Sequence, residues 1–414
     1  MAALLAMSTL GFAGYALLLP LAPLWAVHGG ADESGAGLVN AVLMGATVVG
    51  QLGVHPAIRR LGWAPVLCAG VLALGLPALL LPLSDALPAV LAVSALRGIG
   101  FAVLTVGGSS AVAELVPPSV RGRAVGLYGL SIALPQMVLV PLGPTLTAVL
   151  PIGVVALLGA LPVLAVPPAL RLGRLITAGT AAEPAAEFSA HPTAESDGPL
   201  RASPGPAAPD SRTVGSLPAP SRRRALLLLA LPSLSLLAIT APGGALLSFT
   251  PQLAPDLRTG AIALFAFTAT TTLSRWLLGH AADRVGPFGL IAPLLLVGAA
   301  GLGLAALGAA GASPAGDSGA LIAGMALAGI AYGGVQNVTL VAAFALVPRQ
   351  RDLASTVWNI GFDVGTGIGS LAVGAIAAAA SFPEGLGWAA ALALLGAAAN
   401  LLRSLVLPRL RSSP

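Results

Sequence analysis

Twelve long apolar runs, separated by short polar turns, dominate the pattern of this chain. A helix that crosses the hydrocarbon core of a bilayer needs about 20 mostly apolar residues, and each run is long enough. Proline and glycine inside the runs are compatible with membrane helices. The pattern therefore predicts an all-α membrane protein with twelve transmembrane helices, near 3–27, 36–57, 63–83, 87–113, 122–149, 151–170, 225–249, 259–280, 287–311, 319–347, 353–380 and 386–407.

One segment breaks this pattern. Residues 175–224 are rich in Pro, Ala and Ser and almost free of aromatic side chains. Such a composition buries too little apolar surface to order itself. The sequence thus predicts a disordered linker, 175–224, between two six-helix bundles, 1–174 and 225–414.

Composition supports a lipid environment. Hydrophobic residues make up 57% of the 414 residues and charged residues 8%, which is too few to cover the surface of a soluble protein. The net charge of +5 could indicate nucleic acid, but all the basic residues are arginines and they lie mainly in the turns between apolar runs. We therefore expect a lipid bilayer as partner and no nucleic acid.

The charges also predict an orientation. Cytoplasmic loops of membrane proteins are rich in basic residues. Alternate turns, the linker and the C-terminal segment hold almost all the arginines: Arg59, Arg60, Arg121, Arg123, Arg171, Arg174, Arg201, Arg212, Arg222, Arg223, Arg224, Arg284, Arg349, Arg351, Arg403, Arg409 and Arg411. The other turns hold Asp32, Glu33, Asp85, Asp256, Asp317 and Glu384, with Arg258. This predicts a multi-pass protein of the inner (plasma) membrane with both termini cytoplasmic.

The two halves repeat. At an offset of 230 residues, Arg121-Gly-Arg-Ala124 aligns with Arg351-Asp-Leu-Ala354, and Tyr128 with Trp358. Earlier in each half, Arg60-Leu-Gly62 parallels Arg284-Val-Gly286. Parallel repeats around a central cavity are a known plan of transporters.

Three motifs resemble the major facilitator superfamily. They are Gly279-His-Ala-Ala-Asp283-Arg284-Val-Gly286, Leu96-Arg97-Gly-Ile-Gly100, and the turn Val116-Pro-Pro-Ser-Val-Arg121-Gly-Arg-Ala124. The resemblance implies the major facilitator fold and alternating access, and it is most similar to bacterial efflux-type members, including drug/proton antiporters. Two stretches depart from the family pattern: His55-Pro-Ala-Ile-Arg59-Arg60-Leu-Gly62 lacks the acidic residue, and Leu139-Val-Pro-Leu-Gly143-Pro144 replaces the usual Gly-Pro-x-x-Gly-Gly.

Two charges lie deep in apolar runs. Asp363 and Arg97 are each about ten residues into a run, roughly 15 Å along the helix. Charged groups at that depth are costly and usually face a cavity or a partner. We expect Asp363 to carry a proton and Arg97 to take part in proton or substrate coupling; a structural ion pair or a clamp on backbone carbonyls is the alternative.

Other polar residues fall into two groups. Substrate-cavity candidates, which could equally join helices through hydrogen bonds, are Gln336, Asn337, Asn359, Gln136 and Asn40. The resemblance implies a gating motif formed by Gly279, Asp283, Arg284 and Gly286. We group Arg275 with it, as a residue that snorkels or pairs with the gate loop, and a structural role is the alternative.

We thus expect a secondary active transporter that acts as a monomer and exports a small organic compound or drug in exchange for protons. A nutrient or metabolite importer of the same fold is the alternative. A membrane enzyme would need clustered His, Asp or Glu at one face, and a non-transporting scaffold is a further possibility. We expect no enzymatic activity, cofactor or metal: there is one cysteine, Cys68, no ligand-like histidine spacing, and no Gly-x-x-x-x-Gly-Lys-Ser/Thr motif for ATP.

Overall fold

The computed structural model describes residues 1–116, 121–189, 221–311 and 314–411. Within them every regular element is helical, and twelve segments are long and apolar enough to cross a membrane. The predicted all-α class and the twelve transmembrane helices are confirmed. The elements are α1 (Ala2–His28), α2 (Glu33–Leu61), α3 (Trp63–Gly75), η1 (Leu76–Leu83), α4 (Leu87–Leu115), α5 (Arg121–Leu146), α6 (Ile152–Leu157), η3 (Leu158–Ala165), α7 (Val166–Ser189), α8 (Arg222–Leu253), α9 (Leu257–Val285), α10 (Pro287–Ala309), α11 (Pro314–Leu346), α12 (Arg351–Ala379) and α13 (Phe382–Arg411).

Two of the twelve spans are composite. The third is α3 followed by the 3₁₀ helix η1, and the sixth is α6, η3 and α7. Each 3₁₀ stretch has a proline inside it, Pro82 in η1 and Pro162 in η3. Proline removes a backbone donor and crowds the preceding turn, which favours tightening of the helix.

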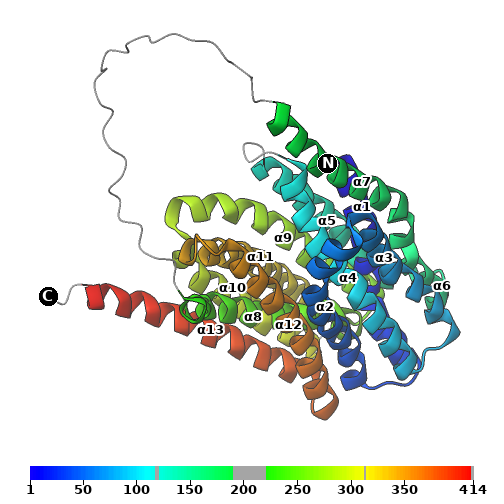
Figure 1. Cartoon of the computed structure of the whole chain (residues 1–414). Coiled ribbons are helices and arrows are strands. Elements are labelled where there is room, and N and C mark those ends of the chain that lie inside the picture. The colour runs from blue at the N-terminus through cyan, green and yellow to red at the C-terminus, as the bar shows by residue number, and fades with distance from the viewer. Residues whose placement is uncertain (117–120, 190–220, 312–313, 412–414) are drawn as a thin grey trace, which may run out of the picture.

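The chain folds into two six-helix halves that lie side by side, the first drawn blue to green and the second green to red in Figure 1. The repeat is clearest in α2 and α9, which have 29 residues each. Asp32 caps the N-terminus of α2 by accepting a hydrogen bond from the Gly35 N–H at 2.8 Å. Asp256 caps the N-terminus of α9 in the same way, accepting from the Thr259 N–H at 2.8 Å. Both helices end at a glycine of positive φ, Gly62 (84°) and Gly286 (83°). The two helices are therefore in register at an offset of 224 residues.

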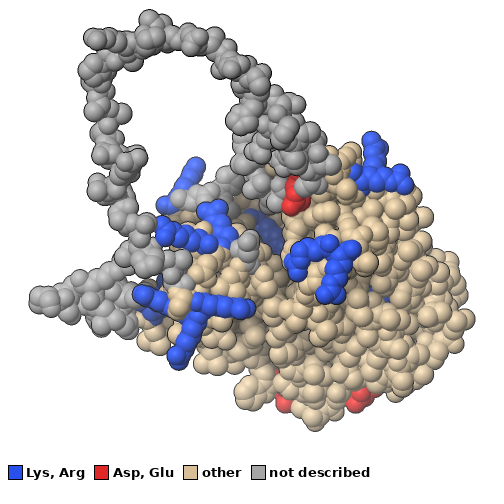
Figure 2. Space-filling model, viewed as in Figure 1, with Lys and Arg blue, Asp and Glu red and all other residues tan. Residues whose placement is uncertain are grey.

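The charges separate toward the two ends of the molecule. In Figure 2 most blue arginine side chains gather over the upper and left parts of the view, where a patch of red also shows, and the other red acidic side chains show at the bottom. We call these the arginine-rich end, with Arg59, Arg60, Arg171, Arg174, Arg222, Arg223, Arg224 and Arg284, and the acidic end, with Asp32, Glu33, Asp85, Asp256 and Glu384.

A seam between α2 and α12 joins the halves. A side chain at Gly37 would overlap the Ser370 carbonyl oxygen, and one at Gly374 would overlap the Glu33 carbonyl oxygen. Only glycine permits so close an approach of two backbones, as is typical of helix packing in membranes. Among the described residues, these contacts lie toward the acidic end, so the halves are closed together there.

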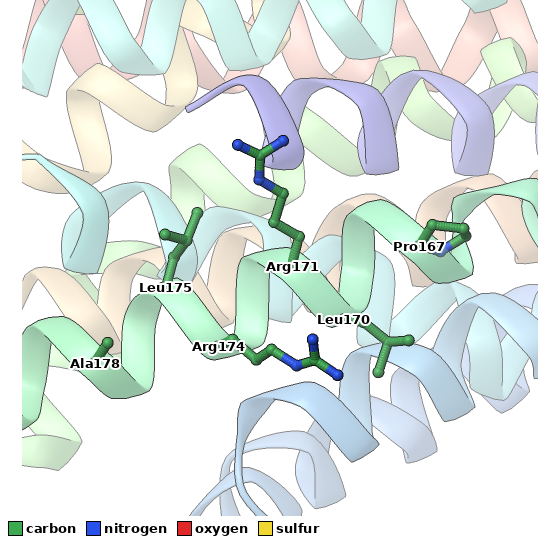
Figure 3. Close-up of a pocket in the computed structure, with 6 residues that line it drawn as sticks. All are labelled: Pro167, Leu170, Arg171, Arg174, Leu175 and Ala178. Carbon is green, nitrogen blue, oxygen red and sulfur yellow. The ribbon is translucent and has the colours of Figure 1, made fainter.

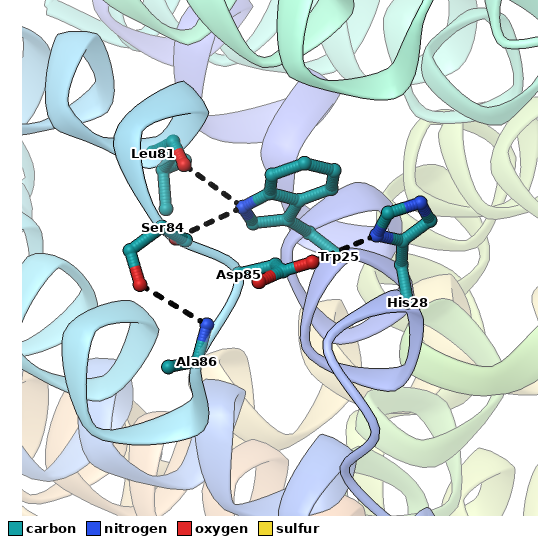
Figure 4. A network of polar contacts seen from close by, with 6 residues as sticks. All are labelled: Trp25, His28, Leu81, Ser84, Asp85 and Ala86. Atoms are coloured by element: carbon teal, nitrogen blue, oxygen red, sulfur yellow. Dashed lines mark hydrogen bonds and ion pairs between the residues drawn. The ribbon is translucent and has the colours of Figure 1, made fainter.

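The acidic end is tied further by the turn between η1 and α4 (Figure 4). The Trp25 indole donates to the Leu81 carbonyl oxygen at 2.9 Å and to that of Ser84 at 3.3 Å. His28 pairs with Asp85 at 2.9 Å and its ring stacks on Trp25. These contacts fix the end of α1 against the third and fourth spans.

The structure describes helix at both edges of the predicted linker. Its first residues are helical, because α7 continues from the sixth span to Ser189, and its last residues belong to α8, which begins at Arg222. Ala-rich sequence has high helix propensity, which explains the extension. Residues 190–220 lie outside the described part of the chain, so the disordered linker stays a prediction.

Candidate functional site

Asp363 forms a polar contact between the two halves. The Gln51 side-chain amide of α2 donates to the Asp363 carboxylate of α12 at 2.6 Å. Asp363 is only 4% exposed, as its depth in the sequence predicts. A buried carboxyl needs such a donor, since an unpaired charge in a low-dielectric interior is costly. The bond lies further from the acidic end than the glycine contacts of the seam.

Two tyrosines lie near this carboxyl. Tyr15 of α1 and Tyr332 of α11 are both buried and within electrostatic range of Asp363. Tyr15 stacks on Phe101 with ring centroids 4.0 Å apart. The Phe362 ring centroid lies 6.2 Å from that of Tyr332 and 5.8 Å from that of Trp358. Asp363 thus lies among apolar and aromatic side chains with a few polar groups, the kind of lining that small-molecule sites use.

Arg97 acts as a clamp between helices in this structure. It is 1% exposed on α4, and it donates to the Leu74 carbonyl of α3 and the Gly14 carbonyl of α1, both at 3.2 Å. This is the structural alternative considered from the sequence. Arg97 is also within electrostatic range of Tyr15, which links it to the surroundings of Asp363. A part in coupling stays a prediction.

Arg275 of α9 contacts two candidate residues of α11. Its guanidinium donates to the Gln336 side-chain oxygen, and its backbone carbonyl accepts from the Asn337 amide at 2.7 Å. Gln336 is 2% exposed, and its side-chain nitrogen has no hydrogen-bond partner in the structure. The structure thus brings Arg275 together with Gln336 and Asn337, and its part in the gate stays a prediction.

The other cavity candidates lie elsewhere. Asn40 donates to the Leu19 carbonyl at 2.9 Å and to the Ser248 hydroxyl at 2.7 Å, and so joins α1, α2 and α8 within the seam. Asn359 bonds the Ser355 carbonyl one turn earlier in α12. Gln136 is half-buried in α5, whose neighbour Met137 accepts from Thr268 of α9. Asn40 is thus placed to hold helices together, and the substrate roles of all three stay predictions.

The gating motif lies at the last turn of α9. Arg284 is exposed, and Gly286 ends the helix by donating to the Ala282 carbonyl at 3.0 Å. The surroundings of Gly279 and the side chain of Asp283 lie outside what the structure describes, as do residues 117–120 of the turn before α5. The gating motif thus lies at the arginine-rich end, and its gating role stays a prediction.

Sequence reasoning missed Gln51, Tyr15 and Tyr332. Gln51 could have been found from the repeat: it is 224 residues before Arg275, and so occupies the same place on α2 as Arg275 does on α9. The tyrosines carry no comparable signal, because an aromatic residue in an apolar run usually packs in the core.

A surface groove of about 580 Å³ lies along α7 at the arginine-rich end. Figure 3 shows that Arg171 and Arg174, which line it, point to different sides of the helix. They do not converge on a common ligand position, so this groove is no substrate site. Among the described residues no three His, Cys, Asp or Glu side chains are placed to bind a metal.

Comparisons with known proteins agree on the fold. A sequence model of the family described as "Major Facilitator Superfamily" matches residues 4–336. No curated protein sequence matches the chain. Among solved structures, a bacterial homolog of the human lysosomal transporter Spinster, in an inward-facing and occupied conformation, has 15% identity and a TM-score of 0.69, over 100% of this chain and 98% of that one.

Two further structures are similar at the level of the fold. The nucleoside transporter NupG (D323A mutant) has 14% identity and a TM-score of 0.66, over 97% of this chain and 99% of that one. A POT family transporter in complex with 5-aminolevulinic acid has 12% identity and a TM-score of 0.69, over 97% and 95%.

Proposed function

Because this chain belongs to the Major Facilitator Superfamily and is a multi-pass secondary transporter, we propose that it is coupled to protons through Asp363 and exports a small organic compound. The observation that carries the proposal is the bond between Gln51 and Asp363, which joins the two halves at a buried carboxyl. Export is supported by the resemblance of the sequence motifs to efflux-type members.

Coupling follows from what a proton does at this position. An ionised Asp363 accepts a charge-assisted hydrogen bond from Gln51, and a protonated one loses the charge that makes this bond strong. Protonation therefore changes the stability of a contact that exists only when the halves are arranged as here. A proton can drive a conformational change only through such a difference between states.

The state described here is closed at the acidic end. We propose that the arginine-rich end faces the cytoplasm of a cell with an inner (plasma) membrane, that both termini are cytoplasmic, and that this is the inward-facing state. The basic residues of cytoplasmic loops support this orientation. One chain supplies both halves of the central site, which supports a monomer as the working unit.

A purified protein in liposomes with an imposed pH gradient tests the proton role. A panel of organic compounds is added while an internal pH dye reports proton flux. The Asp363→Asn variant should lose compound-dependent proton flux while remaining folded. Asp32→Asn is a matched control, because Asp32 is an exposed cap at the acidic end and asparagine caps equally well. Undiminished proton flux in the Asp363 variant would refute its role.

Import of a nutrient or metabolite is the second candidate. The altered stretch Leu139–Pro144 lacks the antiporter pattern, and the neighbours in structure include a nucleoside transporter. The same liposomes distinguish the two directions: with an antiporter, adding compound on one side moves protons out of the compartment the compound enters, whereas with a symporter both enter together.

A further inference from the structure

Arg275 is a cation in the membrane-spanning part of the protein with no acidic partner among the described residues. Among the described residues, His28 and Asp85 form an ion pair at the acidic end, away from Arg275. The guanidinium carries five N–H donors, and the side-chain bond seen is to Gln336. Arg275 is half-buried, whereas Arg97 is buried and two backbone carbonyls from neighbouring helices accept its N–H groups.

The repeat explains what is missing beside Arg275. On α2 the same position holds Gln51, which reaches across the boundary between the halves to Asp363 of α12. The corresponding boundary on the other side of the molecule is between α9 and α5, which meet at Thr268 and Met137. At the offset of 230 residues that relates α5 to α12, the position of Asp363 is occupied by Ala133. By the repeat, the place beside Arg275 that corresponds to Asp363 is therefore without an acid.

The groups near Arg275 indicate which kind of ligand would pair with its guanidinium. The Gln336 oxygen accepts from the guanidinium, and its buried side-chain nitrogen, beside Tyr332, has no acceptor at hydrogen-bond geometry. Together they offer N–H groups to two oxygen atoms, which suits the planar, singly charged carboxylate. A doubly charged phosphate would be a poorer match, because Tyr332 is in electrostatic range of Asp363 as well as Arg275 and a second negative charge would lie in the same apolar space.

The remaining surroundings are aromatic. Tyr332 packs against Phe267 and Phe362, and Phe362 stacks on Trp358. Ring systems of a ligand would find offset-stacked or edge contacts there.

We propose that the transported compound is an organic carboxylate with an aromatic or otherwise apolar body, whose carboxylate binds Arg275 and the Gln336 side-chain nitrogen. This rests on the proposed transporter function, since it assigns the substrate class of the same central site. In this view the substrate supplies, on the α5–α9 side, the negative charge that Asp363 supplies on the α2–α12 side.

Binding to the purified full-length protein tests the proposal without any transport. Phenylacetate, indoleacetate and naphthoate are compared with the amide and the amine of the same skeletons by the shift in thermal unfolding and by titration. Carboxylates should bind and stabilise, and the matched amides should bind at least about tenfold more weakly, which is the size of one charge-assisted hydrogen bond.

Variants locate the site. Arg275→Gln should weaken carboxylate binding about tenfold to a hundredfold and Arg275→Lys less, because lysine keeps the charge but loses the fork geometry. Arg258→Gln, an exposed arginine on the same helix, is the control and should bind normally. Unliganded unfolding temperatures show whether each variant is folded.

Three results would overturn the assignment: equal binding of acid and amide, preference for the amine, or failure of every carboxylate to bind at millimolar concentration. Carboxylate binding that is normal in Arg275→Lys and Arg275→Gln alike would place the site elsewhere. Carboxylate binding without any transport in liposomes would instead refute the proposed function and leave the site standing.

Discussion

At the scale of single residues, the sequence predicts which polar groups are buried but does not predict their hydrogen-bond partners. The depth of Arg97 and Asp363 along apolar runs shows that each must be compensated. The partners found are two backbone carbonyls for Arg97 and a glutamine 312 positions away for Asp363. A carbonyl has no sequence signature, and a long-range pair depends on how two helices are rotated, so neither partner could be derived.

Replacing Arg97 by lysine tests its clamp role. Lysine has a single ammonium on a flexible stem and cannot place two N–H groups on the Leu74 and Gly14 carbonyls as the guanidinium does. Each lost hydrogen bond to a charged group is worth about 1.5–3 kcal/mol, so Arg97→Lys should clearly lower the thermal unfolding temperature in detergent. The exposed Arg174→Lys change should leave it unaltered. An unchanged Arg97→Lys protein would show that the clamp contributes nothing to stability.

At the scale of elements, the pattern of apolar runs located all twelve spans within several residues. What it could not give was the internal form of two of them, because the change from α to 3₁₀ geometry depends on how Pro82 and Pro162 are accommodated by their neighbours. The caps follow a local rule and were in principle readable: an Asp precedes both α2 and α9, three residues before the N–H that it binds.

The Asp256 cap predicts a pH dependence of stability. The Thr259 backbone N–H, followed by its hydroxyl, holds the pKa of the Asp256 carboxyl below its ordinary value. A carboxyl whose folded pKa is lowered contributes its full stabilisation above the unfolded pKa of about 3.9 and loses it as the pH falls through the folded value.

Asp256→Asn should remove this dependence, because asparagine caps α9 without titrating. Thermal unfolding of both proteins is measured from neutral pH to about pH 3. The wild-type unfolding temperature should fall more steeply on the acid side than that of the variant. Parallel curves would mean that the cap does not contribute through its charge.

At the scale of the whole molecule, the repeat and the charge asymmetry were readable from the sequence, and the two-half arrangement agrees with them. Which end is closed was not readable. That property depends on the approach of α2 and α12 at Gly37 and Gly374, and many other glycines in the sequence make no comparable contact. For example, a side chain at Gly45 of the same helix would meet nothing.

Widening the seam should open the acidic end. Gly37→Val would place methyl groups against the Ser370 carbonyl, whereas Gly45→Val is accommodated and serves as the matched control. In a Cys68→Ser background, a cysteine introduced at Ser370 should react several-fold faster with a membrane-impermeant maleimide in the Gly37→Val protein. Equal rates in both valine variants would contradict the seam as the point of closure.

The orientation is testable in cells. Fusions of a fluorescent protein after Gly198, within the predicted linker, should fluoresce, because that protein matures in the cytoplasm. Alkaline phosphatase at the same point should be inactive, and the two reporters should exchange behaviour when placed after Asp85, at the acidic end. The reverse pattern would invert the assigned topology.

The seam has a consequence for electrical insulation. From Glu33 to Gln51 it extends about 27 Å along α2 at 1.5 Å per residue, close to the roughly 30 Å of the hydrocarbon core. A closed contact of this length prevents ions from leaking across the membrane while the open end of the protein exchanges substrate. Gly374 meets α2 at Glu33, Gly37 meets Ser370, and Gly367 meets Met44, so the close contacts extend over about three turns of α2. Opening one of these turns should therefore alter the transport cycle before it makes the membrane leak ions.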